Sequence, residues 1–161
     1  MKRNLKKVLS DILFQNTGST TSILEAIMNK TVEVEIIQER IICDSDYSTQ
    51  YNWGDSLVMR ATTLKAGGID ISNNIVIYDA DKVKQLDDFC VQNCSIPIGK
   101  IFSDLRKPAY LSKYYDFFNL TTTKYPVKEY QFVHNGEVYF HIIELYLEDN
   151  LFDILNGTLI I

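Results

Sequence analysis

Two charged residues interrupt strongly apolar stretches of this sequence. Arg60 lies in residues 57–61 among leucine, valine, methionine and alanine, and Glu144 lies in residues 141–147 among mainly isoleucine, leucine and tyrosine. An inward arginine presents a planar fork suited to a carboxylate, and a glutamate in a dry pocket accepts a hydroxyl proton or acts as a general acid or base. Both would then need partners, because an isolated buried charge is unfavourable. The pair indicates a site for a small polar acid, unless each residue points to water from the solvated face of a sheet.

The familiar signatures of other chemistry are absent from the sequence. It contains no Gly-x-Gly-x-x-Gly, no phosphate-binding Gly-Lys-Ser/Thr loop, no Gly-x-Ser-x-Gly and no His-Glu-x-x-His. No acidic or cysteine residue has metal-ligand spacing with both His134 and His141, so we interpret them as structural or surface histidines. The three cysteines are an odd number and are interpreted as reduced thiols. We expect no metal and no cofactor.

Composition narrows the class of protein. The net charge of −5 argues against a nucleic-acid surface, which needs clustered lysine and arginine. No apolar run approaches the ~20 residues that span a bilayer, and the start of the chain does not resemble a signal peptide. We therefore expect a cytoplasmic protein that contacts no membrane. A length of 161 residues with 46% hydrophobic content fits one domain, residues 1–161, and leaves the oligomeric state open.

Alternating apolar residues predict the strands that must position Arg60 and Glu144. Strands are expected at 31–37, 57–65 and 69–78, and the last two are joined by a glycine turn at 66–68. The dipeptide Asn135-Gly136 predicts a hairpin between strands at 130–134 and 138–147.

Helical spacing of apolar residues predicts three helices. They are expected at 4–14, from a capping box at Ser22 and Glu25 to about residue 30, and at 79–93, where Asp79 or Asp81 supplies the cap. Residues 44–55, which carry Tyr51 and Trp53, are expected to form a loop. Residues 103–124 are rich in tyrosine and phenylalanine and form either a helix or an irregular lid. The tail from 149 to 161 either packs on the sheet or joins a partner chain.

Strands joined by hairpins, with the helices segregated from them, indicate an α+β fold with an antiparallel sheet and helices packed on one face. Four short blocks in this order also resemble the chorismate pyruvate-lyase family. They are the hydroxyl-rich helix start at 17–25, the arginine strand at 57–64, the Pro97-Ile98-Gly99-Lys100 segment and the glutamate strand at 143–147. Only the ordered set is specific, and it spans most of residues 12–148.

This resemblance implies a ligand pocket enclosed by two helical flaps and a cofactor-free reaction that converts chorismate to 4-hydroxybenzoate and pyruvate. Carried over by position, Arg60 would clamp the substrate carboxylate and Glu144 would lie at the ring hydroxyl. Thr20 and Ile98 would occupy the other ligand-contacting positions, acting through the backbone. The expected partner is therefore chorismate or a related aromatic acid precursor, and the expected enzyme class is a carbon–oxygen lyase.

The sequence also departs from the family pattern. Residues 71–76 lack the expected small-residue step and the following proline, and Arg106 is displaced from the usual Thr/Ser-Arg element. Two alternatives stay open: a lyase that acts on a chorismate relative, and a non-catalytic domain of the same fold that senses a small aromatic acid, as in the effector domains of one family of bacterial transcription regulators. The sensor reading needs a DNA-binding partner domain, for which we expect the residues before Leu13 to be too short.

Overall fold

A computed structural model describes residues 5–15, 19–85, 98, 106–107 and 127–158. The elements in chain order are α1 (Leu5–Gln15), α2 (Thr20–Met28), β1 (Val32–Ile42), α3 (Ser45–Tyr51), β2 (Leu57–Ala66), β3 (Ile69–Asp79), α4 (Ala80–Val83), β4 (Arg106–Lys107), β5 (Val127–His134), β6 (Glu137–Tyr146) and α7 (Glu148–Thr158). The strands form one antiparallel sheet in the order β1-β2-β3-β6-β5-β4. The predicted α+β class with an antiparallel sheet is confirmed.

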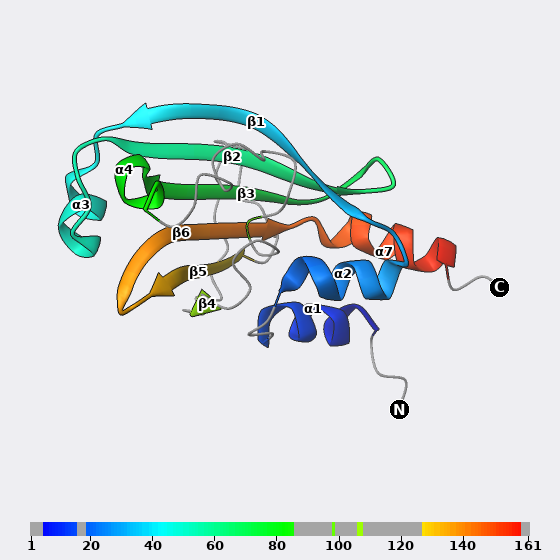
Figure 1. Ribbon diagram of the computed structural model, residues 1–161. Helices are drawn as coiled ribbons and strands as arrows, with labels where there is room; N and C mark the ends of the chain where they lie inside the picture. The colour runs from blue at the N-terminus through cyan, green and yellow to red at the C-terminus, as the bar shows by residue number, and fades with distance from the viewer. Residues whose placement is uncertain (1–4, 16–18, 86–97, 99–105, 108–126, 159–161) are drawn as a thin grey trace.

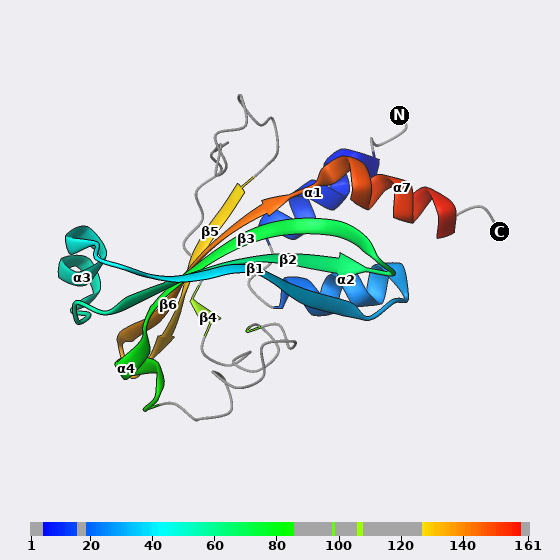
Figure 2. The same ribbon diagram turned by 90° about the horizontal axis from the view of Figure 1, so that it is seen from above.

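Helices α1, α2 and α7 gather at one end of the sheet, and α3 lies at the other (Figure 1). Seen from above, the strands fan out, as expected from the twist of a sheet (Figure 2). One apolar cluster joins the three gathered helices to the strands; its buried members are Leu9, Leu13, Leu24, Met28, Val32, Leu64, Ala66, Ile71, Tyr146, Leu151 and Ile154. The tail therefore packs against the sheet through α7, which was one of the two expectations for it.

The register of the strands defines the face of the sheet that these helices cover, which we call the inner face. Directly paired residues of neighbouring strands project to the same face, as do alternate residues of one strand. Starting from the buried Leu64, the inner face carries Arg60 and Thr62 of β2, Ser72, Asn74, Val76 and Tyr78 of β3, Phe140, Ile142, Glu144 and Tyr146 of β6, and Lys128, Tyr130 and Phe132 of β5.

A β-bulge changes which residues of β1 reach the inner face. The register shifts between Ile36 and Gln38, so Ile37 is the extra residue. Before the bulge the even-numbered residues project inward, and after it Glu39 does, opposite Arg60. The strands predicted at 57–65 and 69–78 are confirmed, as is the hairpin at Asn135 and Gly136, where both residues have positive φ angles of 50° and 82°.

The outer face of the sheet is covered at one end by α3, where a loop was expected. The Asp44 side chain caps this helix by accepting hydrogen bonds from the backbone N–H groups of Asp46 and Tyr47, 3.0 and 3.2 Å away. Tyr51 and Trp53 then pack on Leu57 and Ile77. The loop prediction was wrong because it rested on the polar composition of 44–55 and did not consider that Asp44 could cap a helix.

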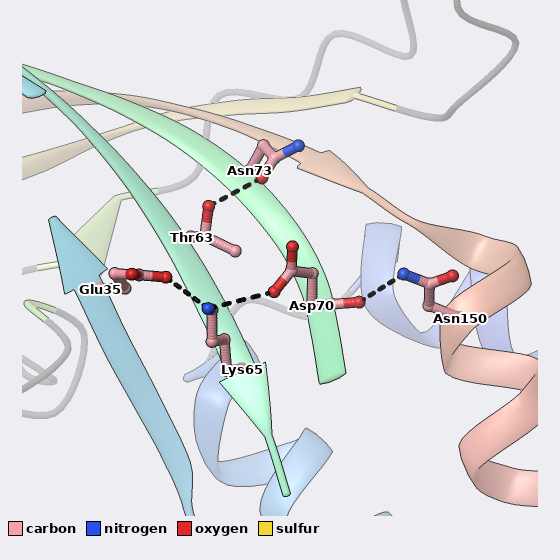
Figure 3. A network of polar contacts seen from close by, with 6 residues as sticks. All are labelled: Glu35, Thr63, Lys65, Asp70, Asn73 and Asn150. Carbon is pink, nitrogen blue, oxygen red and sulfur yellow. Dashed lines mark hydrogen bonds and ion pairs between the residues drawn. The ribbon is translucent and has the colours of Figure 1, made fainter. Parts of the chain in front are cut away.

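Farther along the outer face, polar side chains contact one another at the other end of β2 and β3 (Figure 3). Lys65 pairs with Glu35 and with Asp70, and Thr63 donates a hydrogen bond to Asn73 across 2.9 Å. The Asn150 side chain donates to the backbone oxygen of Asp70, 2.9 Å away, and so ties α7 to β3. This end of the outer face is polar where the inner face opposite is apolar.

One predicted helix cap differs in the structure, and another is confirmed. Ser19, not Ser22, caps α2: its side chain accepts from the Ser22 backbone N–H at 3.2 Å. Glu25, the expected capping-box partner, instead accepts from the backbone N–H of Val32 at 2.8 Å and links α2 to the start of β1. Asp79 caps α4, as one of the two expected alternatives, and the rest of the predicted helix at 79–93 lies mostly outside the described residues.

The buried Asp79 carboxylate holds two segments together. It accepts hydrogen bonds from the backbone N–H groups of Asp81 and Lys82 at 2.9 and 3.2 Å and from that of Gly54 at 2.7 Å. Removing it leaves these donors unpaired, so Asp79→Ala is expected to lower the free energy of unfolding by about 2 kcal/mol in urea titrations. The exposed neighbour gives the control: Asp81→Ala should leave the urea midpoint nearly unchanged. Equal effects of the two substitutions would contradict this account.

Candidate functional site

Arg60 lies on the inner face with only 6% of its surface exposed. Its Nε donates to Glu39 Oε2 at 2.5 Å, and Nη2 donates to the hydroxyl of Tyr78 at 3.1 Å. The guanidinium carbon also lies 5.6 Å from the centre of the Tyr78 ring. We call these three side chains the Arg60 cluster. A buried guanidinium is thus paired with a glutamate from the edge strand, whose own side chain is 45% exposed.

Glu144 is also buried on the inner face, and tyrosine hydroxyls donate to both of its oxygens. The Tyr130 hydroxyl donates to Oε1 at 3.0 Å, and the Tyr146 hydroxyl donates to Oε2 at 2.8 Å. Burial, and next the negative charge of Glu144, raise the pKa of Tyr146 well above its usual 10.0. Tyr146 therefore keeps its proton near neutral pH and remains a donor to the carboxylate.

A lysine completes this group from the neighbouring strand. Lys128 is fully buried and pairs directly with Glu144 in the β5–β6 register. Its Nζ donates to the backbone oxygen of Leu13 at 3.1 Å and lies 3.5 Å from the hydroxyl of Thr20, which is itself 3.5 Å from the Tyr146 hydroxyl. A cation at the last turn of α1 suits the carbonyls that end a helix.

The side chains of Thr20, Lys128, Tyr130, Glu144 and Tyr146 together are called the Glu144 cluster. All five are buried, and they come from α2, β5 and β6. This cluster ties the end of α1 and the start of α2 to the centre of the sheet.

The Arg60 and Glu144 clusters share the inner face of the sheet. Arg60 lies on β2 and Glu144 on β6, with β3 between them, and they are offset by one side-chain row. Two strand spacings and two residues along a strand separate their Cα atoms by about 12 Å. The residues between them are Val76 and Ile142 in the Arg60 row, and Thr62 and Asn74 in the Glu144 row.

The structure brings the four predicted site residues to this one face. Arg60 and Glu144 both point inward, which settles the choice between an inward and a solvated orientation. Thr20 joins the Glu144 cluster, and Ile98 packs against the apolar cluster that contains Tyr78 and Tyr130. Their roles in binding remain predictions.

Sequence reasoning missed Glu39, the partner of Arg60, and Lys128, a member of the Glu144 cluster. Lys128 continues the alternation of Tyr130 and Phe132, so the pattern that predicted the hairpin could also have placed Lys128 on the inner face. Glu39 could not be predicted in this way, because a strict period of two would place it on the outer face. The bulge at Ile37 moves it inward.

His141 lies on the outer face, away from both clusters. Its Nδ1 is 2.8 Å from the Tyr51 hydroxyl, and its Nε2 is 2.7 Å from Oε1 of Glu129. Burial lowers the pKa of His141 below 6.5, and the negative charge of Glu129 opposes part of that shift. Tyr51 also accepts from Gln131 at 2.9 Å, so the histidine belongs to a network that fastens α3 to the sheet.

Several expectations fall partly or wholly outside the described residues. These are Cys90, Cys94, most of the Pro97–Lys100 block and most of 103–124, of which Arg106 and Lys107 form β4. Cys43 is an exposed free thiol. Within the described residues, no group of three histidine, cysteine, aspartate or glutamate side chains is arranged to hold a metal ion. No helix in the described part of the chain is long and apolar enough to cross a membrane.

The chain is similar in structure to ligand-binding domains of bacterial transcription regulators. The effector domain of PhnF from Mycobacterium smegmatis superposes with a TM-score of 0.59 at 11% identity, over 81% of this chain and 89% of that domain. The ligand-binding domain of a GntR-family regulator from Bordetella bronchiseptica gives a TM-score of 0.53 at 10% identity, over 74% of this chain and 87% of the other. In the longer PhnF structure the match covers 84% of this chain and 66% of PhnF, with a TM-score of 0.59.

At such identities the likeness is one of fold. No protein-family profile matches this sequence, and no curated protein matches it. The fold is related to that of the chorismate pyruvate-lyases, but membership of that family is not shown. The predicted carbon–oxygen lyase activity was wrong: the structures described above are an effector domain and a ligand-binding domain of regulators.

The burial of His141 predicts an acid-sensitive fold. Because its pKa is lower in the folded state than the usual 6.5, stability is fully present above about pH 6.5 and falls as the pH drops below that value. We expect the urea midpoint to fall between pH 7.5 and 5.5, and His141→Gln to reduce that dependence. The groups facing His141 are Glu129, Tyr51 and Tyr47. An unchanged slope in His141→Gln would refute the prediction.

Proposed function

We propose that this chain is a non-catalytic domain, extending over residues 1–161, that binds a small organic acid on the inner face between the Arg60 and Glu144 clusters. The observation that carries the proposal is the burial of a guanidinium and a carboxylate on one sheet face, one row apart, with tyrosine hydroxyls bonded to both. Neither charge is needed to build an antiparallel sheet, whose inner positions are ordinarily apolar.

The Arg60 cluster is suited to the acidic group of the ligand. A guanidinium offers N–H donors in a plane that matches a carboxylate, and Tyr78 holds that plane in place. Glu39, its present carboxylate partner, comes from the edge strand and is about half exposed. An entering carboxylate would therefore replace Glu39 at Arg60, and the displaced glutamate would remain hydrated.

The Glu144 cluster is suited to a hydroxyl group at the other end of the ligand. Each carboxylate oxygen has two lone pairs, so Glu144 can accept a further hydrogen bond beside each tyrosine hydroxyl. The two tyrosine hydroxyls keep the carboxylate fixed. Such a preorganised acceptor favours binding, and it leaves the ligand chemically unchanged.

The comparisons support a sensing role for this binding. Two structures of the same fold are an effector domain and a ligand-binding domain of transcription regulators. We propose by analogy that occupation of the inner face by a small acid alters how this chain engages another protein or domain.

Isothermal titration calorimetry with 4-hydroxybenzoate, chorismate and benzoate tests the proposal, with pyruvate measured in the chorismate samples. We expect at least one acid to bind, no release of pyruvate, and a loss of affinity of about 10- to 100-fold in Arg60→Met, the usual range for one charged hydrogen-bonding group. Arg40→Met is the matched control, since Arg40 lies on the neighbouring strand and is exposed. Equal affinities of the two variants would refute the site, and stoichiometric pyruvate would refute the non-catalytic assignment.

A further inference from the structure

Within the part of the chain that the structure describes, two buried polar atoms on the inner face have no hydrogen-bond partner. They are Oδ1 of Asn74 and Oγ of Ser72, on residues that are 5% and 0% exposed. Buried polar groups in folded proteins are almost always paired, because an unpaired one loses its bonds to water and gains nothing in return. Both atoms lie on β3, two residues apart, and project to the same face as Arg60 and Glu144.

The position of Asn74 on β3 indicates what its unpaired oxygen would bind. Asn74 pairs with Thr62 of β2 on one side and with Glu144 of β6 on the other, so it lies in the centre of the span between the two clusters. Ser72 pairs with Leu64 and with Tyr146, one row nearer the helices. A molecule that reached from Arg60 to Glu144 would cross β3 between Val76 and Asn74.

We propose that Asn74 is a specificity-determining residue whose Oδ1 accepts a hydrogen bond from a ligand hydroxyl, and that Ser72 extends this recognition. The ligand class is then a small acid that carries several hydroxyl groups, since one hydroxyl meets Glu144 and at least one more meets Asn74. A planar aromatic acid with one hydroxyl satisfies Glu144 and leaves Asn74 unpaired. This inference rests on the function proposed above and deepens it.

The physical basis is the penalty for leaving a buried acceptor unpaired in the complex. A site built to bond a hydroxyl rejects an analogue that lacks it far more strongly than an apolar pocket rejects an extra methylene. Substitution of Asn74 should also have an unusual effect on the stability of the free protein. Because Oδ1 has no partner there, replacing Asn74 by an apolar side chain of similar size should not destabilise the fold, although the position is buried in the sheet.

The adjacent residue provides a matched control. Asn73 lies on the same strand and projects to the opposite face, where its Oδ1 accepts from the Thr63 hydroxyl at 2.9 Å (Figure 3). Its hydrogen bond is made within the protein and its side chain cannot reach the proposed ligand. Asn73→Ala should therefore lower the melting temperature and leave ligand preference unaltered.

The test compares acids built on six-membered rings by calorimetry: shikimate and quinate, which carry several hydroxyls, against 4-hydroxybenzoate and benzoate. We expect the wild-type protein to bind the better of the two hydroxylated acids at least 10-fold more tightly than 4-hydroxybenzoate. Asn74→Leu should abolish that preference while keeping or raising the melting temperature of the free protein. Ser72→Ala should reduce the preference by a smaller factor.

Each other outcome has a definite meaning. If 4-hydroxybenzoate binds as tightly as the hydroxylated acids and its binding still depends on Arg60, the inference about Asn74 is overturned and the proposed function stands. If Asn74→Leu melts well below the wild type, Asn74 is structural and the inference is again overturned. If no acid binds, the proposed function fails and this inference fails with it.

Discussion

The burial of Lys128 is the constraint on which the rest of the structure depends. A buried ammonium is strongly unfavourable without partners, and Lys128 Nζ donates to the backbone oxygen of Leu13 in the last turn of α1 and lies 3.5 Å from the hydroxyl of Thr20 at the start of α2. Lys128 lies directly opposite Glu144 in the β5–β6 register. These contacts therefore fasten two helices to the centre of the sheet.

The second constraint is the bulge in β1. One extra residue at Ile37 brings Glu39 opposite Arg60 and gives the buried guanidinium a carboxylate partner from a strand edge that faces water. The two clusters thus differ in kind: the Glu144 cluster is internal, whereas the Arg60 cluster includes an exposed glutamate. Under the proposed function, the acidic group of the ligand replaces this glutamate at Arg60.

The sequence predicted most of the strands, because alternation and the turns at 66–68 and at Asn135-Gly136 are local signals. It also selected Arg60 and Glu144, since a charge in an apolar strand is conspicuous. Prediction failed where a distant contact or an irregularity determines the structure. These cases are the bulge at Ile37, the contact of Lys128 with the end of α1, and the helix α3. The lyase assignment failed for another reason, because a fold shared with an enzyme family carries no catalytic chemistry with it.

Backbone and side-chain NMR during titration with a bound acid would test the inner-face site most directly. The account predicts that the largest shifts fall on the Arg60 Nε–H and on the amides of Asn74 and Glu144, while the indole N–H of Trp53, which donates to Val138 on the outer face, stays in place. Shifts centred instead on Trp53, Tyr51 and His141, with the Arg60 signal unmoved, would place the ligand on the outer face and contradict the account.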